Sequence, residues 1–348
     1  MKPEVTIATL NWNGIKYVKT FFDSVASQGF PKEKTEVIMV DNGSTDGSLE
    51  FVKKNFPFVK TIELEKNYGF SEACNMAYSA SQGKFFLQSG NDTIMPKDLV
   101  SNMLSEIKKT SAAAVVAIDY PIGSELSEER FADTINIICG NSVGARKDFN
   151  APAIPRGTFI LDKSQIGGEL FDGEYFAYGE DTWLGFKLLL AGKKAIYSPK
   201  CKIWHDGAKT GSRLPTLTFY TERNRLLNIF TFFKAKTILK IFPIMIIDFF
   251  VKLFSFALSL NFQRLKNFFR AYAWMILNVG KVLKKRAALQ AERKFGDEKI
   301  ISVMSYKLYG YQRMKSTHTS FILGIADKFM ELYCRLLGLK VYELSKKK

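Results

Sequence analysis

Short apolar runs alternate with longer amphipathic stretches over the first third of the chain. Five short runs contain mainly β-branched and aliphatic side chains, which is typical of strands. They are residues 5–10, 36–41, 61–65, 84–89 and 112–119. Between them, apolar side chains recur every three or four positions, as in amphipathic helices. These stretches are residues 14–28, 47–56, 71–82 and 98–110.

This alternation of strands and helices predicts an α/β fold. Strands that are joined by single helices form a largely parallel sheet, which helices cover on both faces. In such sheets, ligands bind beyond the carboxyl ends of the strands. The residues just after the predicted strands are therefore the first candidates for a functional site.

Polar segments follow three of the predicted strands. They are VDNGSTDGS at 40–48, EKNYGFSEACN at 65–75 and QSGNDT at 88–93. Each alone is also typical of a polar turn in which Asp, Asn or Ser caps the next helix. Because all three would meet at one edge of the sheet, we predict a ligand site there. The chain has no G-x-G-x-x-G after its first strand and no G-x-x-x-x-G-K-[ST], which disfavours a dinucleotide fold and excludes a P-loop.

Two adjacent carboxylates, Glu180 and Asp181, occur in the sequence AYGEDTW at 177–183, directly before an apolar helical run. Acidic side chains at a helix start can stabilise that end of the helix without any further function. A carboxylate held there can also act as a general base toward a bound hydroxyl. From this segment alone, both interpretations are open.

From Asp248 onward, polar residues recur at helical spacing in a segment that is otherwise rich in Phe, Ile and Leu. The series is Asp248, Lys252, Ser255, Ser259, Gln263, Lys266 and Arg270. An amphipathic helix in the plane of a membrane surface explains both this stripe and the surrounding basic residues, and we favour it. A buried bundle helix and a transmembrane span are the alternatives, although residues 241–260 include Pro243, Asp248 and Lys252.

The basic charge of the chain is confined to its C-terminal part. The 348 residues have a net charge of +16, of which residues 1–205 contribute −2 and residues 206–348 contribute +18. Together with the apolar character of that part, this charge indicates an anionic membrane surface, and not nucleic acid, as the partner. Four cysteines at unrelated spacings indicate neither a disulfide framework nor a zinc site, and the N-terminus lacks the apolar region of a secretory signal.

Six motifs, taken in order, resemble those of glycosyltransferase family 2, and most closely its rhamnosyltransferase-like branch. They are TLNWNG, VDNGSTDGS, NYGFSEACN, GND, RGTFILDKSQIGGELFDGEYFAYGEDTW and SPKCKIWHDG. The resemblance implies that residues 1–225 form a GT-A domain, which is a Rossmann-like nucleotide-diphospho-sugar transferase fold. Residues 226–348 are then predicted to form a basic, amphipathic helical region that associates with a membrane.

The resemblance also implies roles for individual residues. Asp181 matches the general base and Glu180 its acidic neighbour, so we favour the catalytic interpretation for Asp181 and leave both open for Glu180. Asp92 matches the last acidic position of the metal motif, and His205 matches a histidine beside the diphosphate and the metal. The residues expected to bind the nucleotide sugar are Thr9, Leu10, Asn11, Asn13, Asp41, Asn42, Asn67, Gly69, Asn75 and Asn91.

The implied reaction moves a sugar from a nucleotide-sugar donor, with inversion at the anomeric carbon, to a hydroxyl of a lipid-linked or glycan acceptor. A divalent cation, Mg²⁺ or Mn²⁺, would neutralise the leaving diphosphate. Because the metal motif is GND, Asn91 is neutral and only Asp92 is charged, which predicts weak metal binding without donor. The expected setting is cell-surface polysaccharide or glycan biosynthesis, by a peripheral or monotopic protein at the cytoplasmic face of the cell membrane.

Two other functions compete with this one. A non-catalytic nucleotide-sugar-binding scaffold would need no acidic pair, and the sequence GED at 179–181 argues against it. A sugar-phosphate nucleotidyltransferase would need a Gly-rich, basic loop after the first strand, and NWNGIKYVK at 11–19 matches that poorly. The sequence is also compatible with a homo-oligomer.

Overall fold

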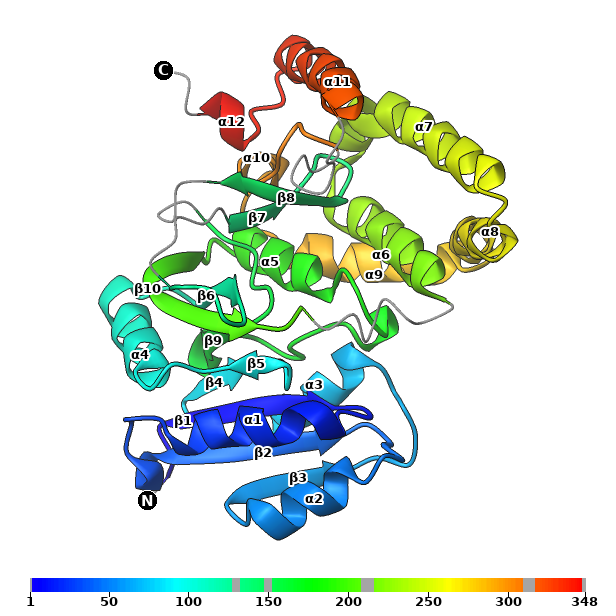
Figure 1. Ribbon diagram of the computed structural model, residues 1–348. Coiled ribbons are helices and arrows are strands. Elements are labelled where there is room, and N and C mark those ends of the chain that lie inside the picture. The colour runs from blue at the N-terminus through cyan, green and yellow to red at the C-terminus, as the bar shows by residue number, and fades with distance from the viewer. Residues whose placement is uncertain (1, 127–131, 147–151, 208–215, 309–316, 346–348) are drawn as a thin grey trace. The chain divides into compact units, whose positions relative to one another are not determined.

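The structure, a computed structural model, describes residues 2–126, 132–146, 152–207, 216–308 and 317–345 (Figure 1). The chain divides into two compact units. The first, the sheet unit, consists of residues 1–129, 149–185 and 193–211, and the second, the helical unit, consists of residues 130–148, 186–192 and 212–348. The domain boundary at residue 225 stays a prediction; helix α6 (Leu217–Phe232) is continuous across it.

An eight-stranded mixed sheet forms the centre of the sheet unit, in the order β3-β2-β1-β4-β9-β6-β10-β5. The strands are β1 (Val5–Asn11), β2 (Thr35–Asp41), β3 (Val59–Glu63), β4 (Phe85–Gln88), β5 (Thr93–Ile94), β6 (Ala114–Pro121), β9 (Phe159–Asp162) and β10 (Ala195–His205). Strands β3, β2, β1, β4, β6 and β10 all run in the same direction. Their carboxyl ends therefore meet at one edge, which is where the sequence predicted a site.

The sheet is less parallel than predicted, because β9 lies antiparallel between β4 and β6, and β5 lies antiparallel to β10. The four residues of β9 form too short an apolar run to be told from a loop in the sequence. Since β9 runs in the opposite direction, its amino end lies at the site edge. Gly157 and Thr158, which precede it, are thereby brought beside the ends of β4 and β6.

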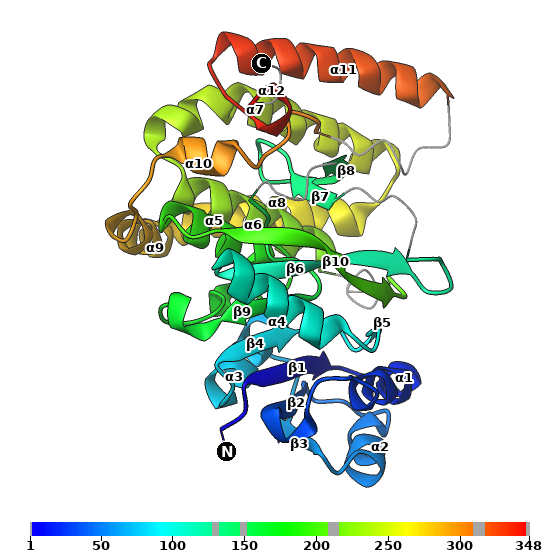
Figure 2. The same ribbon diagram turned by 90° about the vertical axis from the view of Figure 1, so that its left-hand side faces the viewer.

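Helices cover both faces of this sheet, as predicted. They are α1 (Ile15–Ala26), α2 (Ser48–Asn55), α3 (Phe70–Ala80), α4 (Leu99–Thr110) and the start of α5 (Glu180–Leu190), with 3-10 turns η1 (Lys32–Lys34), η2 (Lys163–Gln165) and η3 (Gly173–Tyr175). Figure 2 shows α1 and α3 on opposite sides of β1 and β2. The buried side chains Val18, Phe21 and Phe22 of α1 follow the predicted helical spacing and share one core cluster with Ile7 of β1.

The helical unit contains most of the C-terminal part of the chain. Its helices are α6, α7 (Ala235–Leu258), α8 (Phe262–Leu277), α9 (Val279–Ala291), α10 (Asp297–Ile301), α11 (Thr317–Leu336) and α12 (Tyr342–Ser345). Strands β7 (Ala132–Ile135) and β8 (Asn141–Arg146) form an antiparallel pair in the same unit. Helices α7 and α11 lie side by side in both views (Figures 1 and 2), and the Tyr333 hydroxyl donates to the carbonyl of Lys240 at 2.6 Å.

A network of four charged side chains joins α6 to α7. Arg225 contacts Glu222 at 2.8 Å and Asp248 at 3.2 Å. Lys252 contacts the same two carboxylates at 2.7 and 2.8 Å. Arg225, Glu222 and Asp248 are buried, and charges removed from water are stable only when they are paired. The network therefore fixes which side of α7 faces α6.

The polar series from Asp248 to Arg270 does not lie on one helix, so the prediction of a single continuous stripe was wrong, whereas the in-plane membrane arrangement stays a prediction. Helix α7 ends at Leu258, and Leu260 takes a positive φ of 50° before α8 begins. The start of the series, Asp248 and Lys252, faces α6, whereas apolar side chains of α7 are exposed. The exposed set is Leu239 (73%), Phe242, Ile246, Ile247, Phe250, Val251, Phe254 and Leu258 (84%).

By length and composition, α7 is the one described helix that could cross a membrane. It has 24 residues, and its most apolar stretch has a mean hydropathy of 2.1. Core helices of soluble proteins can meet the same criterion, but only 22% of this stretch is buried. In-plane and spanning arrangements of α7 both agree with this exposure, and a fully buried bundle helix does not.

Candidate active site

Asn11, at the carboxyl end of β1, is the centre of a buried hydrogen-bond network at the site edge. Its Nδ2 donates to Asp41 Oδ1 at 2.8 Å and to Ser48 Oγ at 2.7 Å, and its Oδ1 accepts from Asn91 Nδ2 at 2.8 Å. The second Asp41 oxygen accepts from the backbone N–H of Ser44 at 2.9 Å. The structure thus brings together three residues predicted to bind the donor, and these residues also hold the edge loops in place.

The loop after β1 is held by its own side chains. Asn13 has a positive φ of 51°, and its Oδ1 accepts from the backbone N–H of Thr45 at 2.8 Å. Asp46 Oδ2 accepts from the N–H of Ile15 at 2.8 Å, which satisfies a free donor at the start of α1. The polar residues of this loop therefore hold the turn and cap the following helix, which was the alternative interpretation of these motifs.

Thr9 of β1 differs from these residues. Its side chain is 1% exposed, and its hydroxyl makes no hydrogen bond with any described residue. A buried hydroxyl without a partner is uncommon in proteins. Leu10, which follows it, is half-buried. Among the residues predicted to bind the donor, Thr9 therefore has a hydroxyl that no described residue uses as a donor or acceptor.

Asn42, Asn67 and Gly69 form a second network beyond β2 and β3. Asn42 Nδ2 donates to Asn67 Oδ1 and to the Gly69 carbonyl, both at 3.0 Å. Gly69 has a φ of +88°, and a Cβ there would lie 2.4 Å from the carbonyl oxygen of Phe176. Only glycine lets this turn pack so closely against the segment that leads to the acidic pair.

Asn75 of α3 contacts the same segment. Its Nδ2 donates to the carbonyl of Phe171 at 2.8 Å, and its Oδ1 accepts from the N–H of Phe171 at 2.9 Å. Both ends of the amide are thus used within the protein. Donor binding by Asn75 stays a prediction, and the observed contacts show that it positions the chain before Glu180.

A cavity of about 200 Å³ opens at this edge of the sheet unit. Its polar lining comes from β4, β6, β10, α5 and the residues before β9. These polar lining residues include Gln88, Asp119, Thr158, Glu180, Asp181 and His205. The acidic pair and His205, which are distant in the sequence, therefore face one space.

Asp181 lies in the first turn of α5 and is held by two groups. Arg156 Nε donates to Asp181 Oδ2 at 2.7 Å, and the backbone N–H of Thr182 donates to Oδ1 at 2.6 Å. The side chains of Asp181 and Arg156 are 19% and 20% exposed, so the pair is partly shielded from water. A carboxylate that is oriented in this way beside a cavity can accept a proton from a bound hydroxyl.

Glu180 differs from its neighbour because the nearby cation is bonded to Asp181. Its Oε2 is buried and makes no hydrogen bond with any described residue. Burial, and after it repulsion by Asp181, raises the pKa of Glu180 to about 8, and Arg156 offsets this only in part. The raised pKa favours the protonated form of Glu180, which makes Asp181 the better candidate for the base.

His205, at the end of β10, lies between two carboxylates. Its Nε2 is 3.2 Å from Asp92 Oδ2, and its Nδ1 is 3.3 Å from Asp119 Oδ2. Hydrogen bonds to Asp119 and Asp92 outweigh burial and raise the pKa of His205 to about 10. The two predicted metal ligands, Asp92 and His205, are thus in contact, and the imidazole is positively charged at neutral pH.

Asp92 and His205 fit a divalent cation only as two ligands of a larger set. Among the described residues, no group of three or more His, Cys, Asp and Glu side chains is arranged to hold a metal ion. Binding through Nε2 would also require His205 to lose a proton. Phosphate oxygens of a donor would have to complete the coordination, as expected for weak metal binding without donor.

Sequence reasoning missed two residues of this site, Arg156 and Asp119. Arg156 begins the motif RGTF, but only the folded chain brings it to Asp181. Asp119 contacts His205 because β6 and β10 are neighbouring strands. Its position at the end of the predicted strand 112–119 was a signal that could have identified it.

Known proteins resemble this chain in both sequence and structure. Residues 5–165 match the family model described as Glycosyl transferase family 2. Over 105 residues, the chain is 34% identical to the poly(ribitol-phosphate) beta-N-acetylglucosaminyltransferase TarS of Staphylococcus aureus, which is 29% of this chain and 18% of that protein.

A second relative is the dolichyl N-acetyl-alpha-D-glucosaminyl phosphate 3-beta-D-2,3-diacetamido-2,3-dideoxy-beta-D-glucuronosyltransferase of Methanococcus voltae. It is 24% identical over 216 residues, which is 56% of this chain and 64% of that protein. The chain therefore spans less than two thirds of the length of either relative.

Among solved structures, the chain resembles the mannosyltransferase PcManGT from Pyrobaculum calidifontis, which was solved in complex with GDP-Man and Mn²⁺. The TM-score is 0.50 at 17% sequence identity, and the superposition covers 100% of this chain and 89% of that chain. At this identity the likeness concerns the fold alone, and it confirms the predicted GT-A architecture.

Proposed function

We propose a sugar-transfer function from one premise: residues 5–165 match the family model of glycosyl transferase family 2. The chain moves a sugar from a nucleotide-sugar donor to an acceptor hydroxyl, in the biosynthesis of a cell-surface polysaccharide or glycan. The observation that supports this most is the cavity shared by Asp181, Glu180 and His205. It combines a carboxylate that can accept a proton with a histidine that can contact a diphosphate as a cation or, once deprotonated, bind a metal ion.

Asp181 is the proposed general base. As the acceptor oxygen attacks the anomeric carbon, its proton moves to the Asp181 carboxylate, and the bond from that carbon to the diphosphate breaks. Arg156 keeps the carboxylate in place at 2.7 Å. A single displacement of this kind inverts the configuration at the anomeric carbon and forms no covalent sugar–enzyme intermediate. Protonated Glu180 can donate a hydrogen bond in the cavity but cannot accept this proton.

The leaving diphosphate is proposed to lie beside Asp92 and His205. A divalent cation held by these two residues would neutralise the charge that the diphosphate gains. The Mn²⁺ in the mannosyltransferase structure supports a metal in this role. Asp119 holds Nδ1 of His205 and so directs Nε2 toward Asp92.

The nucleotide of the donor is proposed to bind along the ends of β1 and β2. The Thr9 hydroxyl is buried and has no described partner, so it can bond to the donor without breaking an existing contact. Asn11 and Asp41 are already bonded to each other. Their side chains are therefore already fixed in position and need no rearrangement when the donor binds.

The acceptor is proposed to be lipid-linked, and the protein to associate with an anionic membrane surface on its cytoplasmic face. The exposed apolar side chains of α7 and the net charge of +18 after residue 205 support this. The Methanococcus voltae relative, whose name specifies a dolichyl-linked phosphate, supports a lipid-linked acceptor. Purified protein should sediment with anionic liposomes more than with neutral ones, and salt should weaken that binding; equal, salt-independent recovery would count against it.

A screen of nucleotide sugars tests the proposed reaction. Purified protein should release a nucleoside diphosphate from at least one donor, and a chelator should slow that release. A non-catalytic scaffold predicts thermal stabilisation by a donor without turnover. A nucleotidyltransferase predicts pyrophosphate release from a nucleoside triphosphate and a sugar phosphate. Either of these outcomes would replace the sugar-transfer proposal.

A further inference from the structure

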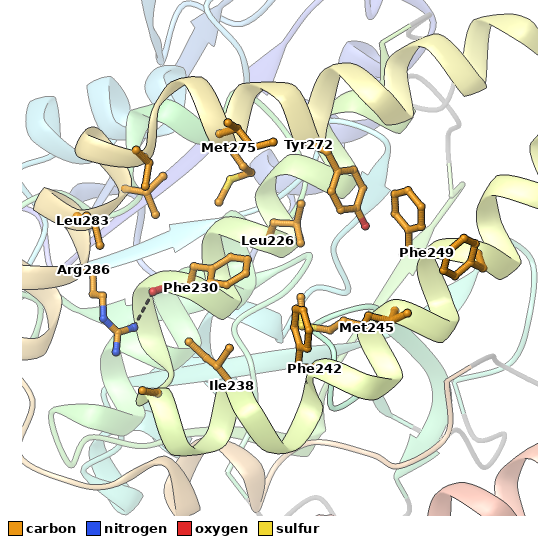
Figure 3. Close-up of a pocket in the computed structure, with 16 residues that line it drawn as sticks. Leu226, Phe230, Ile238, Phe242, Met245, Phe249, Tyr272, Met275, Leu283 and Arg286 are labelled. Atoms are coloured by element: carbon orange, nitrogen blue, oxygen red, sulfur yellow. Dashed lines mark hydrogen bonds between the residues drawn. The ribbon is translucent and has the colours of Figure 1, made fainter.

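An apolar groove lies in the helical unit, between α6, α7, α8 and α9 (Figure 3). Its volume is about 960 Å³, at the upper end of the range for ligand pockets. Leu226 and Phe230 of α6, Ile238 and Phe242 of α7 and Met275 of α8 are among the side chains that line it. Because nearly all of its surface is apolar, the groove favours an apolar occupant over water.

Arg286 of α9 lies at one end of this groove, and Tyr272 lies toward the other end in Figure 3. Nη1 of Arg286 donates to the carbonyls of Phe230 and Phe233, each at 2.6 Å, at the C-terminal end of α6. No acidic side chain in the described ranges pairs with Arg286. The guanidinium therefore places a positive charge, not neutralised by a carboxylate, beside an apolar surface.

The helices that form the groove are strongly basic. Residues 234–294 contain 13 Lys and Arg and only two acidic residues, Asp248 and Glu292. Asp248 is paired within the buried network between α6 and α7. Lys234 and Lys284 are exposed and directly adjoin residues that line the groove. The charge of this surface is complementary to an anion.

We propose that the apolar groove binds the hydrocarbon chain of a phosphate-bearing lipid, with the phosphate at the Arg286 end. The chain gains free energy by leaving water along the whole length of the groove. The phosphate gains from Arg286, because guanidinium groups bind phosphate oxygens through two parallel hydrogen bonds. The proposal does not depend on sugar transfer, so lipid binding and donor turnover can succeed or fail separately.

Alkyl phosphates of increasing length, used below their micelle concentrations, test the apolar part of the proposal. Each buried CH₂ should tighten binding about fourfold, so dodecyl phosphate, which has four more CH₂ groups than octyl phosphate, should bind about 200-fold more tightly if all four are buried and at least about tenfold more tightly if two are, as measured by calorimetry. Inorganic phosphate should show no measurable binding. Dodecyl maltoside, which has the same chain and an uncharged headgroup, should bind more weakly than dodecyl phosphate.

Substitutions in α7 separate the groove from the rest of the apolar surface. Ile238→Trp fills the groove and should weaken dodecyl phosphate binding at least about tenfold, which is the loss of two or more buried CH₂ contacts. Leu239→Trp is the matched control, because Leu239 is the next residue, is 73% exposed and does not line the groove. Met275→Trp fills the groove from α8 and serves if Ile238→Trp does not fold, as judged by circular dichroism.

Substitutions of arginine test the charged end. Arg286→Gln should remove the preference for dodecyl phosphate over dodecyl maltoside, whereas Arg286→Lys should keep part of it. Arg264→Gln is the control, because Arg264 is exposed on α8 and does not line the groove. If Arg286 only caps α6, Arg286→Gln will lower the thermal midpoint but leave the headgroup preference intact, which would overturn this part of the proposal.

Two results would overturn the proposal as a whole. One is equal affinity for octyl and dodecyl phosphate in the unmodified protein. The other is a concentration-dependent dimer that Ile238→Trp, but not Leu239→Trp, dissociates, together with no alkyl phosphate binding. That second result would mean that another copy of the chain covers the groove.

Discussion

Glu180 in the sheet unit is half-buried with a buried Oε2, and Glu222 in the helical unit is buried, yet their pKa values move in opposite directions. Burial opposes ionisation of each. For Glu222, Arg225 and Lys252 outweigh burial and hold the pKa below its usual value. For Glu180, the nearby Arg156 is bonded to Asp181, and the pKa rises to about 8. The comparison shows that the neighbouring cations, and not the depth of burial, decide the protonation state.

The two regions also differ in what they leave unsatisfied. At the edge of the sheet, most polar groups are hydrogen-bonded to one another; the exceptions include the buried Thr9 hydroxyl of β1 and Oε2 of Glu180, which lines the cavity. In the helical unit, the charges between α6 and α7 are paired, and the exposed side chains of α7 are largely apolar. Unpaired buried polar groups are typical of a polar binding site, and exposed apolar surface is typical of a protein or membrane interface.

The largest effect is expected from Asp181→Asn. Loss of the base should reduce transfer by about 10²–10⁴-fold while donor affinity changes by no more than a few-fold. Steady-state kinetics and donor titration measure the two quantities separately. Asp23→Asn, on the exposed surface of α1, is the control and should be silent. Near-normal turnover in Asp181→Asn would remove Asp181 from the mechanism.

Arg225→Met should strongly destabilise the protein, because it leaves Glu222 and Asp248 buried without their main cation. Breaking a buried ion pair from one side costs about 3–5 kcal/mol of unfolding free energy, measured by urea denaturation. Arg156→Met, whose side chain is 20% exposed, should cost less stability and instead impair transfer. Similar stability losses in both variants would mean that Arg156 stabilises the fold as much as Arg225 does, which contradicts a mainly functional role for Arg156.

Asp119→Asn should weaken metal binding through His205 and so raise the metal concentration that the reaction requires. Loss of a group that orients a metal-binding histidine costs about 10- to 100-fold in metal affinity or activity. The Mn²⁺ concentration for half-maximal donor turnover is the quantity to measure. Asp98→Asn, at the start of α4, is an acidic control outside the cavity. An unchanged metal requirement in Asp119→Asn would mean that His205 does not contact the metal.

The two glutamates should also differ in how their contribution to the free energy of unfolding depends on pH. Because the folded-state pKa of Glu180 is raised from 4.5 to about 8, its stabilising contribution is complete below pH 4.5 and is lost as pH rises to about 8. Glu180→Gln should therefore gain stability relative to the unmodified protein across that window. Urea denaturation at several pH values measures this, and a constant difference would contradict the raised pKa.

Glu222→Gln should change the pH dependence of the unfolding free energy in the opposite direction to Glu180→Gln. The folded-state pKa of Glu222 is lowered, so its contribution is present above pH 4.5 and is lost as pH falls through the lowered value. The variant should be less stable than the unmodified protein at neutral pH, and the two should converge in acid. If the two stabilities instead converged at high pH, the pKa of Glu222 would be raised, and Arg225 and Lys252 would not outweigh its burial.

The first four strands and helices could be predicted because the period of their apolar residues changes between two and about 3.6. Strand β9 could not, since FILD is short and its antiparallel position depends on β4 and β6. The end of α7 was missed because Leu260, not glycine, takes the positive φ that separates α7 from α8. The inward orientation of Asp248 depends on Arg225, a tertiary contact that helical spacing does not report.

The acidic pair and His205 could be named from motifs, since each lies at an element end that the motif marks. Their division of roles could not. The contact of Arg156 with Asp181 joins residues in separate elements, and burial of Glu180 follows from packing around α5. These features favour Asp181 over Glu180 as the proposed proton acceptor.

The most direct test of the proposed mechanism is the anomeric configuration of the sugar at the moment it leaves the donor. The donor found in the screen is mixed with the protein, and the first product is observed by proton NMR before the sugar equilibrates in water. One displacement with Asp181 as base predicts a configuration opposite to that in the donor, and no product from Asp181→Asn. Retention of configuration would contradict it.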